Sequence, residues 1–450
     1  MDRREFGRVL IGSAAAALAA RRVPLFGFAQ EPASAQYSIN SGRLRASLEA
    51  LSQFGRLPQG GVTRVAWTQP DIDARRFVME KLMPEAGLVP RIDPAGSIFG
   101  RREGKQKDLP VILFGSHIDS VPEGGIFDGD LGSISAIEVM RTLRDRNIET
   151  RHPLECVIWS NEEGAHYGRG LFGSSAAVGI VDRAEFSLKD ERGVPFLDAV
   201  RAIGGDVSKI DQARRRPGEV AAYLELHIEQ GGVLDKSGIP IGVVEGIVAV
   251  SRYLARITGI ANHAGTTPMP DRRDALIAAS RLVLAVREEV VREPGRQVGT
   301  VGNLSVEPNA PNVVPGKVEM TIEVRDLSLE KVNSIVGRIQ RRASEIANQT
   351  TTTIEITHTS THEPALATPW MREIIAHEAE AAGLKTFSMP SGAGHDAQMI
   401  ARIAPMGMIF VPSVGGISHS TKELTRWQDC ANGCEVLYRS VLAVDHRLAG

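Results

Sequence analysis

The residues of this chain that could do chemistry begin with one histidine and two carboxylates that follow an apolar segment. Residues 111–114 (VILF) form a continuous apolar run, which predicts a buried strand because the pattern does not alternate. His117 and Asp119 come just after it, and Asp128 follows in a glycine-rich loop. Residues two apart in extended backbone point the same way, so Asp119 can hold the ring of His117 while the other ring nitrogen binds a metal. Alternatively, the segment is a polar loop with solvated charges, and its sequence alone does not distinguish this loop from a metal site.

Three further apolar runs lead to the same kinds of side chain. Glu162 and Glu163 follow residues 154–159, and two adjacent carboxylates at the end of a buried strand need a metal or a shared proton. His227 comes at the end of a third run, and His419 follows residues 409–413. A charged turn would explain any one of these segments. Four strand ends that each deliver a histidine or a carboxylate pair indicate a common site.

The elements that must position these residues alternate between helix and strand. Apolar residues spaced three and four apart predict helices within 44–54, 72–83 and 134–143, and apolar runs predict strands at 111–114, 154–159 and 221–226. This alternation is typical of an α/β layer with a largely parallel sheet. Ligands of such sheets bind beyond the carboxyl ends of the strands, where the histidines and carboxylates lie.

Residues 245–361 have a different pattern. Strands are predicted at 248–257, 300–306, 318–325 and 352–357, with helices at 276–290 and 332–346. This βαββαβ order is typical of a ferredoxin-like module. Because α/β patterning resumes near residue 368, we predict that the module is inserted into a catalytic domain made of residues 38–244 and 362–450.

Composition excludes several classes of function. The chain has 450 residues, and 52 basic side chains nearly balance 54 acidic ones, for a net charge of −2. This balance carries no electrostatic footprint for nucleic acid or for a membrane surface. Its three cysteines form neither a disulfide framework nor a zinc-knuckle spacing.

The N-terminus has the features of an export signal. Arg3 and Arg4 precede Phe6, residues 9–20 are apolar, and residues 27–29 (GFA) offer a cleavage site with small residues. The arginine pair resembles a twin-arginine signal, which suits a protein exported already folded around a metal. A frayed basic tail is the alternative. We predict a signal peptide over residues 1–29 and an exported, periplasmic protein.

Taken together, the motifs resemble those of the hydantoinase/carbamoylase branch of the dinuclear-metal amidohydrolases and exopeptidases. This branch holds N-carbamoyl-L-amino-acid hydrolases, β-ureidopropionases and allantoate amidohydrolases. The matching segments run in family order over nearly the whole mature chain: GSHIDSV with FDG, SNEEG, ELHIEQG, NHAGTTPM, PNVVPG, SGAGHDA and GGISHS. The resemblance implies an α/β catalytic domain with a mixed or parallel sheet, an inserted ferredoxin-like dimerisation (lid) domain, and a homodimer.

The resemblance also implies a site for two divalent metal ions per subunit. Asp128 would bridge the ions, His117 and His227 would complete one, and Glu163 and His419 the other, with Asp119 behind His117. Nitrogen and oxygen ligands suit zinc, and manganese or cobalt are alternatives. Two ions lower the pKa of a bridging water, and Glu162 would act as its general base and pass the proton to the leaving nitrogen.

Substrate contacts follow from the same resemblance. His263 would stabilise the oxyanion from the partner subunit, and Asn312 and Arg325 would bind a substrate carboxylate. Arg325 also lies on the polar face of a predicted strand, and its planar guanidinium suits a carboxylate, although a single strand arginine is ordinarily a solvated charge. The residues that would line the site and hold the ureido or amide end are Gln230, Gly392, Ala393 and His395; His395 beside Asp396 could equally be a structural pair.

The implied function is hydrolysis of a carbon–nitrogen bond, other than a peptide bond, in N-carbamoyl-L-amino acids or related ureido acids such as allantoate. A metallopeptidase or aminoacylase is the alternative, and His227 argues against it because exopeptidase relatives often have an acid there. A binding protein without catalysis would lack Glu162 or a metal ligand, and none is missing. His166, Tyr167 and Asp130 depart from the family pattern close to the ligands and leave the substrate open.

Overall fold

A computed structural model describes residues 38–448 of the chain. The predicted signal peptide, residues 1–29, lies outside the described residues. Within the described range, no helix is both long enough and apolar enough to cross a membrane.

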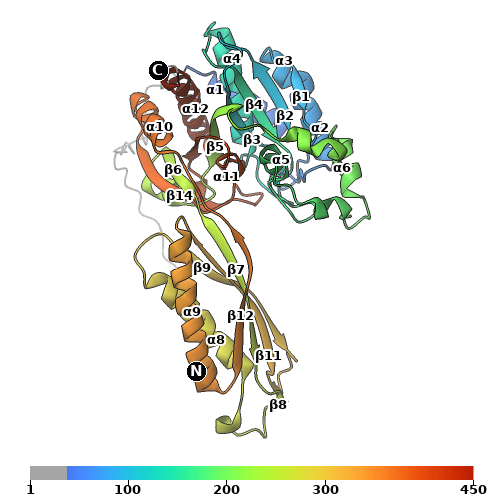
Figure 1. Ribbon diagram of the computed structural model, residues 1–450, viewed down its shortest axis with the longest axis vertical. Coiled ribbons are helices and arrows are strands. Elements are labelled where there is room, and N and C mark those ends of the chain that lie inside the picture. Colours follow the sequence, from blue (N-terminus) through green and yellow to red (C-terminus); the bar gives the residue numbers. More distant parts are fainter. Residues whose placement is uncertain (1–37, 449–450) are drawn as a thin grey trace, which may run out of the picture. The chain divides into compact units, whose positions relative to one another are not determined.

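A nine-stranded mixed sheet forms the larger part of the structure (Figure 1). Its central strands, β4, β3, β5 and β15, are parallel neighbours, and the strands on either side of this group pair antiparallel. In spatial order the path is β1 (Pro90–Ile92), β2 (Ile98–Arg102), β4 (Leu154–Trp159), β3 (Val111–His117), β5 (Val220–Ile228), β15 (Met406–Val411), β6 (Ile241–Ile247) and β13 (Ala365–Leu366), with β14 (Thr386–Ser391) beside β6.

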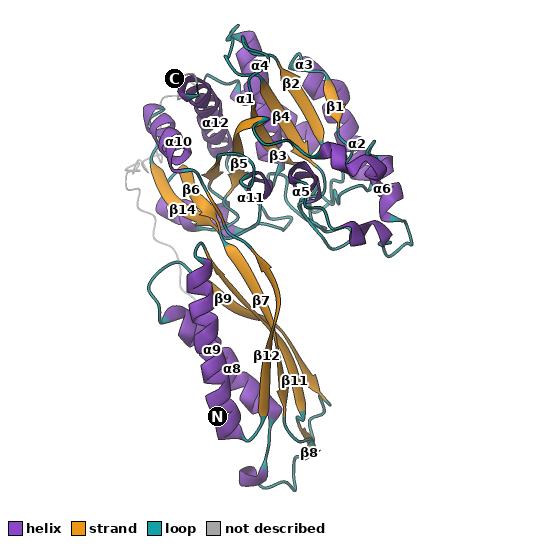
Figure 2. Cartoon of the chain, viewed as in Figure 1, coloured by secondary structure: helices purple, strands orange, loops and turns teal. Residues whose placement is uncertain are grey.

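Both faces of this sheet are buried, which explains why its strands are continuously apolar rather than alternating. Along β3, Ile112 and Phe114 belong to one hydrophobic core, while Val111 and Leu113 belong to another. Helices therefore pack on both sides of the sheet (Figure 2). They are α1 (Ser41–Leu51), α2 (Gln69–Phe77), α3 (Met83–Glu85), α4 (Asp130–Asp145), α5 (Phe172–Val178), α7 (Val233–Ser237), α10 (Pro369–Ala381), α11 (Asp396–Ile400) and α12 (Trp427–Arg447). A further helix, α6 (Phe196–Ala202), packs in a separate small core that it shares with α5.

A second, four-stranded antiparallel sheet has its own core, formed with two long helices. Its strand order is β12 (Thr353–His362), β7 (Ala249–Thr258), β11 (Lys317–Asp326) and β9 (Val298–Glu307), and its helices are α8 (Ala275–Val291) and α9 (Leu329–Thr350). Buried residues alternate with less buried ones along β11, as its sequence pattern predicts. Two short strands, β8 (Asn262–His263) and β10 (Val313–Val314), pair with each other and were not anticipated.

The predicted fold class, an α/β protein with a mixed sheet, is confirmed. The predicted strands of the large sheet correspond to β3, β4, β5 and β15, whereas β1, β2, β6, β13 and β14 of the same sheet were not predicted from the sequence. Among the predicted strands, β3 extends to His117 and β5 to Ile228, beyond the apolar runs that predict them. The extensions add polar residues, whose backbone groups still pair within the sheet. The proposed role of the smaller sheet in dimerisation, and the domain boundaries assigned from the sequence, stay predictions.

Candidate metal centre

The four strands that were expected to deliver the site are neighbours at the centre of the large sheet. β4, β3, β5 and β15 are parallel, so their carboxyl ends lie at the same edge. His117 is the last residue of β3, and His227 lies one residue before the end of β5. The loop after β4 carries Glu162 and Glu163, and the loop after β15 carries His419. The sheet therefore brings together residues that are up to three hundred positions apart.

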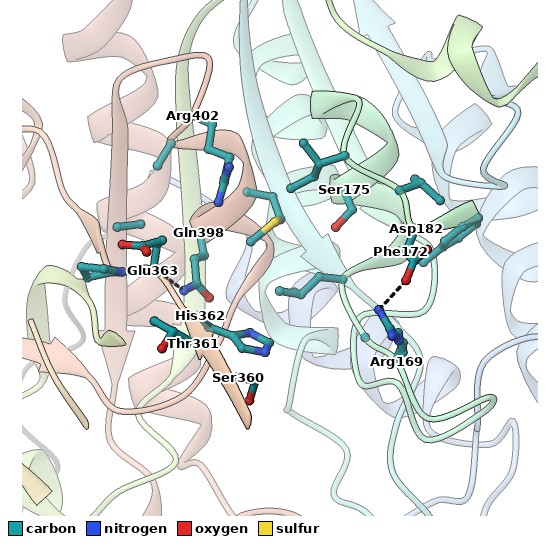
Figure 3. A pocket seen from close by; sticks show the side chains of 18 of the residues that line it. Arg169, Phe172, Ser175, Asp182, Ser360, Thr361, His362, Glu363, Gln398 and Arg402 are labelled. Carbon is teal, nitrogen blue, oxygen red and sulfur yellow. Dashed lines mark hydrogen bonds and ion pairs between the residues drawn. The ribbon is translucent and has the colours of Figure 1, made fainter. Parts of the chain in front are cut away.

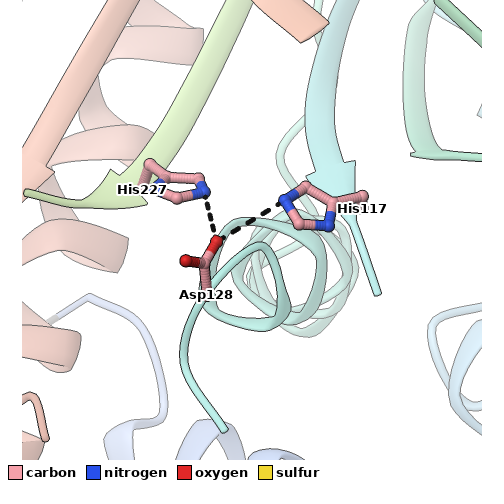
Figure 4. A group of neighbouring side chains, drawn as sticks. All are labelled: His117, Asp128 and His227. Carbon is pink, nitrogen blue, oxygen red and sulfur yellow. Dashed lines mark ion pairs between the residues drawn. The ribbon is translucent and has the colours of Figure 1, made fainter. Parts of the chain in front are cut away.

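One group of possible metal ligands consists of His117, Asp128 and His227, all buried (Figure 4). Asp128 Oδ1 lies 3.1 Å from His227 Nε2 and 3.7 Å from His117 Nε2. The Nδ1 atom of each ring faces a main-chain carbonyl, Asp119 O at 3.0 Å for His117 and Ile228 O at 2.9 Å for His227. Because a carbonyl only accepts, Nδ1 carries the proton and Nε2 is directed at the site, which is the arrangement of metal-binding histidines.

The second group is formed by Asp128, Glu163 and His419. His419 Nε2 lies 3.4 Å from Asp128 Oδ2 and 3.5 Å from Glu163 Oε2. The two groups thus share Asp128, and its two oxygens face different groups. A carboxylate placed in this way is suited to bridge two cations.

The glycine after Asp128 is required by the packing of this loop. Gly129 has a φ of +66°, which side chains rarely adopt, and a Cβ there would lie within 2.5 Å of the His117 ring. The close approach lets the chain turn directly from Asp128 into α4. A glycine is therefore required directly after Asp128, because any larger residue would collide with the His117 ring.

The electrostatics of the site favour added positive charge. Burial, together with the neighbouring charges of Glu163 and Asp396, raises the pKa of Glu162 well above its usual value. Burial and the charge of Asp128 likewise raise the pKa of Glu163. Burial opposes the charged form of His227, yet the Asp128 carboxylate outweighs it and raises the pKa of His227 to about 9. Burial is the main reason that the pKa of His117 falls to about 4.

The residues present fit two divalent ions. Glu163 Oε1 is buried without a hydrogen-bond partner, which is costly unless another group satisfies it. The two groups offer three imidazole nitrogens and carboxylate oxygens, a donor set that suits zinc and other first-row divalent metals. The site is therefore suited to bind two divalent metal ions, and the residues predicted as ligands from the sequence are the same residues that form the two groups.

Glu162 and Asp119 lie beside the first group, in roles that differ from each other. Glu162 Oε2 is 3.7 Å from His117 Nε2, and Glu162 lines the cavity with the ligands. The expectation that the Asp119 carboxylate orients His117 needs correction, because its main-chain carbonyl does so. The carboxylate lies 3.7 Å from the ring and accepts the backbone N–H groups of Glu162 and Glu163, both at 3.2 Å. Asp119 thus fixes the turn that carries both glutamates.

The predicted contacts to the ureido end lie around the same cavity, which has a volume of about 390 Å³. Gln230 donates its amide to Asp128 Oδ2 at 2.7 Å, and its Oε1 is buried without a partner. The His395 ring packs against that of His227 and bonds Ser391 Oγ at 2.8 Å. Ala393 lines the cavity. Gly392 contributes through its carbonyl, which accepts a hydrogen bond from Arg325 Nη1 at 2.6 Å.

Arg325 reaches this cavity from the smaller sheet, whereas His263 and Asn312 do not. Arg325 lies opposite Val250 on β7, near one end of the sheet. His263 follows the other end of β7 and pairs with Val313, and both His263 and Asn312 are exposed. Eight strand residues separate the two ends, or roughly 25 Å at the rise of a β-strand. The structure therefore does not bring His263 and Asn312 together with the ligands of their own chain.

Two residues of the site were missed by the sequence analysis. Glu423 is buried and accepts the backbone N–H groups of Phe127 and Asp128, at 3.1 and 3.2 Å, and the hydroxyl of Ser418 at 2.8 Å. It joins the Asp128 loop to the His419 loop, and no spacing in the sequence indicates this. Glu225 is buried beneath the site and accepts from Ser116 Oγ at 2.7 Å. Its position two residues before His227, on the same side of β5, was a usable signal.

The three residues that depart from the family pattern lie outside the cavity lining. Asp130 is buried in an ion pair with Arg64, and burial raises the pKa of Asp130 to about 7. His166 bonds Ala66 O at 2.8 Å and Asp190 Oδ2 at 3.2 Å, and Tyr167 donates to Val194 O at 3.1 Å. Because they are close to the ligands in sequence, no preferred substrate was assigned from the sequence. The structure instead shows these side chains holding loops together.

A larger cavity, about 920 Å³, adjoins the first and shares with it Gly170, Leu171, Arg252, His362 and Gln398. Figure 3 shows its two walls, one with Arg169 and Asp182 and the other with residues 360–363 and Gln398. Arg169 is paired with Asp182 at 3.0 Å, and Gln398 donates to the Glu363 carbonyl at 2.6 Å. The site thus opens into a space lined by both polar and apolar side chains.

A mixed sheet with two ligand groups that share one aspartate is the arrangement of a dinuclear-metal protein, and the comparisons agree. The model of peptidase family M20/M25/M40 matches residues 113–443. N-carbamoyl-L-amino acid amidohydrolase of Geobacillus stearothermophilus is 40% identical over 403 residues, covering 90% of this chain and 98% of that protein. Allantoate amidohydrolase of Escherichia coli K12 is 34% identical, with coverages of 88% and 95%.

A solved structure gives the same result. The crystal structure of an amidase of the hydantoinase/carbamoylase family from Burkholderia multivorans has a TM-score of 0.83 and 35% identity, and covers 90% of this chain and 98% of that one. The chain therefore belongs to peptidase family M20/M25/M40, and within it to the hydantoinase/carbamoylase family of amidases. The resemblance drawn from the sequence motifs is confirmed.

Proposed function

We propose that this protein is a metal-dependent amidohydrolase that cleaves a carbon–nitrogen bond, other than a peptide bond, in an N-carbamoyl-L-amino acid or a related ureido acid. The observation that carries the proposal is a single cavity lined by both ligand groups, Glu162 and Arg325. It pairs a hydrolytic centre with a cation suited to a substrate carboxylate. The names of the relatives, N-carbamoyl-L-amino acid amidohydrolase and allantoate amidohydrolase, support the same substrate class.

Two divalent ions, with zinc as the proposed metal and manganese or cobalt as alternatives, would be held by the two groups that share Asp128. When bound, such ions supply Lewis-acid activation of water and of the scissile carbonyl. The main-chain carbonyls that fix the rings of His117 and His227 keep both Nε2 atoms directed at the site that would hold the ions.

Glu162 is the proposed general base and then general acid. It is adjacent to Glu163, but Glu163 faces His419 and Asp128, whereas Glu162 faces His117 and the cavity. From this position its carboxylate can take the proton of a water molecule in the cavity, and the same group can return the proton to the leaving nitrogen. The Asp119 carboxylate accepts the backbone N–H groups of both glutamates and so fixes the turn in which their side chains point in different directions.

The proposed enzyme is a homodimer in which the partner subunit supplies His263 and Asn312. The support is a stripe of exposed apolar residues on α8, at seven-residue intervals: Ile277, Leu284 and Val291 are 50%, 61% and 68% exposed. Residues seven apart lie on the same face of a helix, and β9 beside it is an open edge of the smaller sheet. An interface there would bury both features and leave His263, at the end of that sheet, available to the other subunit.

Export through a twin-arginine signal is proposed from residues 1–29 alone. Fractionation of cells that express the full chain tests this proposal. The mature protein should appear in the periplasmic fraction, and a variant with Arg3 and Arg4 replaced by lysine should stay in the cytoplasm.

The experiment that tests the function measures ammonia release by purified, metal-loaded protein. The substrates are a panel of N-carbamoyl-L-amino acids, allantoate, N-acyl amino acids and dipeptides. Turnover of a ureido acid, with loss of activity after chelation, is the expected result. Turnover confined to the N-acyl amino acids or dipeptides would instead identify an aminoacylase or peptidase.

The role of Arg325 is tested with an N-carbamoyl-L-amino acid and its carboxamide. Arg325→Ala removes a charge-assisted contact of about 1.5–3 kcal/mol, which lowers kcat/KM for the acid roughly tenfold to a hundredfold. The carboxamide carries no negative charge, so the substitution should lower kcat/KM for the carboxamide much less. Equal losses on both would show that Arg325 is structural.

A further inference from the structure

The guanidinium of Arg325, the proposed carboxylate-binding group, already holds a carboxylate of its own chain. Its Nε and Nη2 atoms lie 2.7 and 2.6 Å from Glu323 Oε1. Its Nη1 atom donates to the carbonyl of Gly392 at 2.6 Å. The edge formed by Nε and Nη2 is one of the edges through which arginine binds a carboxylate with two parallel hydrogen bonds. Glu323 therefore occupies a place that a substrate carboxylate would take.

Glu323 is held on its other side by a second arginine. Arg252 Nε donates to Glu323 Oε2 at 2.6 Å, so each oxygen of the carboxylate faces a different guanidinium. Glu323 and Arg252 are directly opposite each other on β11 and β7, whereas Arg325 lies two residues further along β11. Directly opposed side chains on antiparallel strands stay within reach of each other. The pair with Arg252 can therefore persist when the contact with Arg325 is broken.

Without a bound substrate, the cluster formed by Arg252, Glu323 and Arg325 contains two positive charges and one negative charge. In the described part of the chain, Glu323 is the only carboxylate in ion-pair contact with either Arg252 or Arg325. Two guanidiniums thus share one carboxylate, and a substrate carboxylate would make the numbers equal. Because the side chains are between a fifth and two fifths exposed, the pairs exchange partners at a lower cost than fully buried ones.

Both arginines line the cavity that contains the metal ligands, and Arg252 also lines the larger adjoining cavity. We propose that Glu323 holds the carboxylate position on Arg325 when no substrate is bound, and that Arg252 retains Glu323 when the substrate carboxylate displaces it. Arg252 and Glu323 are then positioning residues that set the affinity for acid substrates through Arg325. The inference rests on the proposed function, because it needs a substrate with a carboxylate.

The test compares KM and kcat of metal-loaded wild type, Arg252→Ala, Glu323→Gln and the double variant on an N-carbamoyl-L-amino acid. Without Arg252, Glu323 binds Arg325 alone, so we expect KM to rise about three- to tenfold while kcat changes little. Glu323→Gln removes the competing charge and should lower KM. In the double variant the competitor is absent, so the loss of Arg252 should no longer raise KM.

Two controls separate this effect from damage to the sheet. Arg256→Ala removes a matched ion pair on the same two strands, with Glu319 at 2.9 Å, which lies outside both cavities. It should leave KM at the wild-type value. The carboxamide of the same substrate does not compete with Glu323, so its KM should shift much less in every variant.

The outcomes distinguish this inference from the proposed function. A rise in KM for Glu323→Gln would show that Glu323 orients Arg325, and an equal effect of Arg252→Ala with or without Glu323 would show that no exchange occurs. Either result overturns the inference while wild-type turnover keeps the function. If the wild type hydrolyses no ureido acid, the proposed function and this inference fail together.

Discussion

At the scale of single residues, the site assigns different tasks to neighbouring side chains of the same type. Glu162 and Glu163 are adjacent, and Asp119 holds the backbone N–H of each. Because successive residues in this turn point in different directions, Glu163 reaches His419 and Asp128 while Glu162 faces His117 and the cavity. Substitutions at these positions should therefore separate proton transfer from metal binding.

Glu162→Gln should abolish turnover and keep the metals. The amide has nearly the same volume but cannot accept the proton, and Glu163 remains in place as a ligand. Metal content by elemental analysis and kcat on a ureido acid are the two measurements. Retention of more than about a few per cent of wild-type kcat would contradict the assignment of the base.

His419→Ala should behave differently and lose metal as well as activity. His419 supplies the only imidazole of the second group, and its removal leaves Asp128 and Glu163 with an incomplete set of ligands. The measurement is metal content after dialysis, with Glu162→Gln as the matched control. Full occupancy of both metals in this variant would mean that His419 is no ligand.

At the scale of elements, the site depends on loops that are fixed to one another. The Asp128 loop and the His419 loop meet through Glu423, which accepts two backbone N–H groups of the first and the Ser418 hydroxyl of the second. These charge-assisted hydrogen bonds hold together the two loops that carry the candidate ligands Asp128 and His419. Glu423 should therefore control metal affinity although it is not itself one of the grouped ligands.

Glu423→Gln should weaken metal binding by roughly tenfold to a hundredfold, the range found when groups behind metal ligands are replaced. The amide keeps one acceptor oxygen where the carboxylate uses two. The measurement is a metal titration of the apo protein. Asp445→Asn is the control, because Asp445 accepts the backbone N–H groups of Arg151 and His152 at 2.8 and 2.7 Å, outside the cavity lining. Equal losses in both variants would contradict a specific role for Glu423.

At the scale of the whole molecule, one question is how His263 could reach a site. Within its own chain, the smaller sheet separates His263 from Arg325 by the length of β7. The proposed dimer resolves this separation, because a second subunit can present its own His263 to the site. The exposed apolar stripe of α8 and the open edge of β9 are the surfaces offered for it.

Mixing two inactive variants tests this arrangement. His263→Ala and Glu162→Gln should each be inactive alone, but a mixed dimer would contain one site with both residues intact. After random exchange of subunits, activity should recover to about a quarter of wild type, because half the dimers are mixed and each has one working site. No recovery, despite exchange shown by mass spectrometry, would contradict the supply of His263 by the partner subunit.

The sequence by itself determined the class of fold and the candidate metal ligands. Buried parallel strands must be apolar on both faces, so the polar residues at their ends stood out, and His117, Glu163, His227 and His419 were found from those positions. The order of motifs along the chain then identified the family. These features are local in sequence, since each is a strand and the few residues after it.

Tertiary structure decided what depends on contacts between distant segments. The Asp119 carboxylate holds two backbone groups more than forty residues away, and Glu423 holds the loop of Asp128 nearly three hundred residues away. Asp130, which departs from the family pattern close to the ligands in sequence, is buried against Arg64. Glu323 and Arg252 face each other only because β11 and β7 pair in one register. No local pattern carries such information, because hydrogen bonds and ion pairs between segments are set by how the sheets bring those segments together.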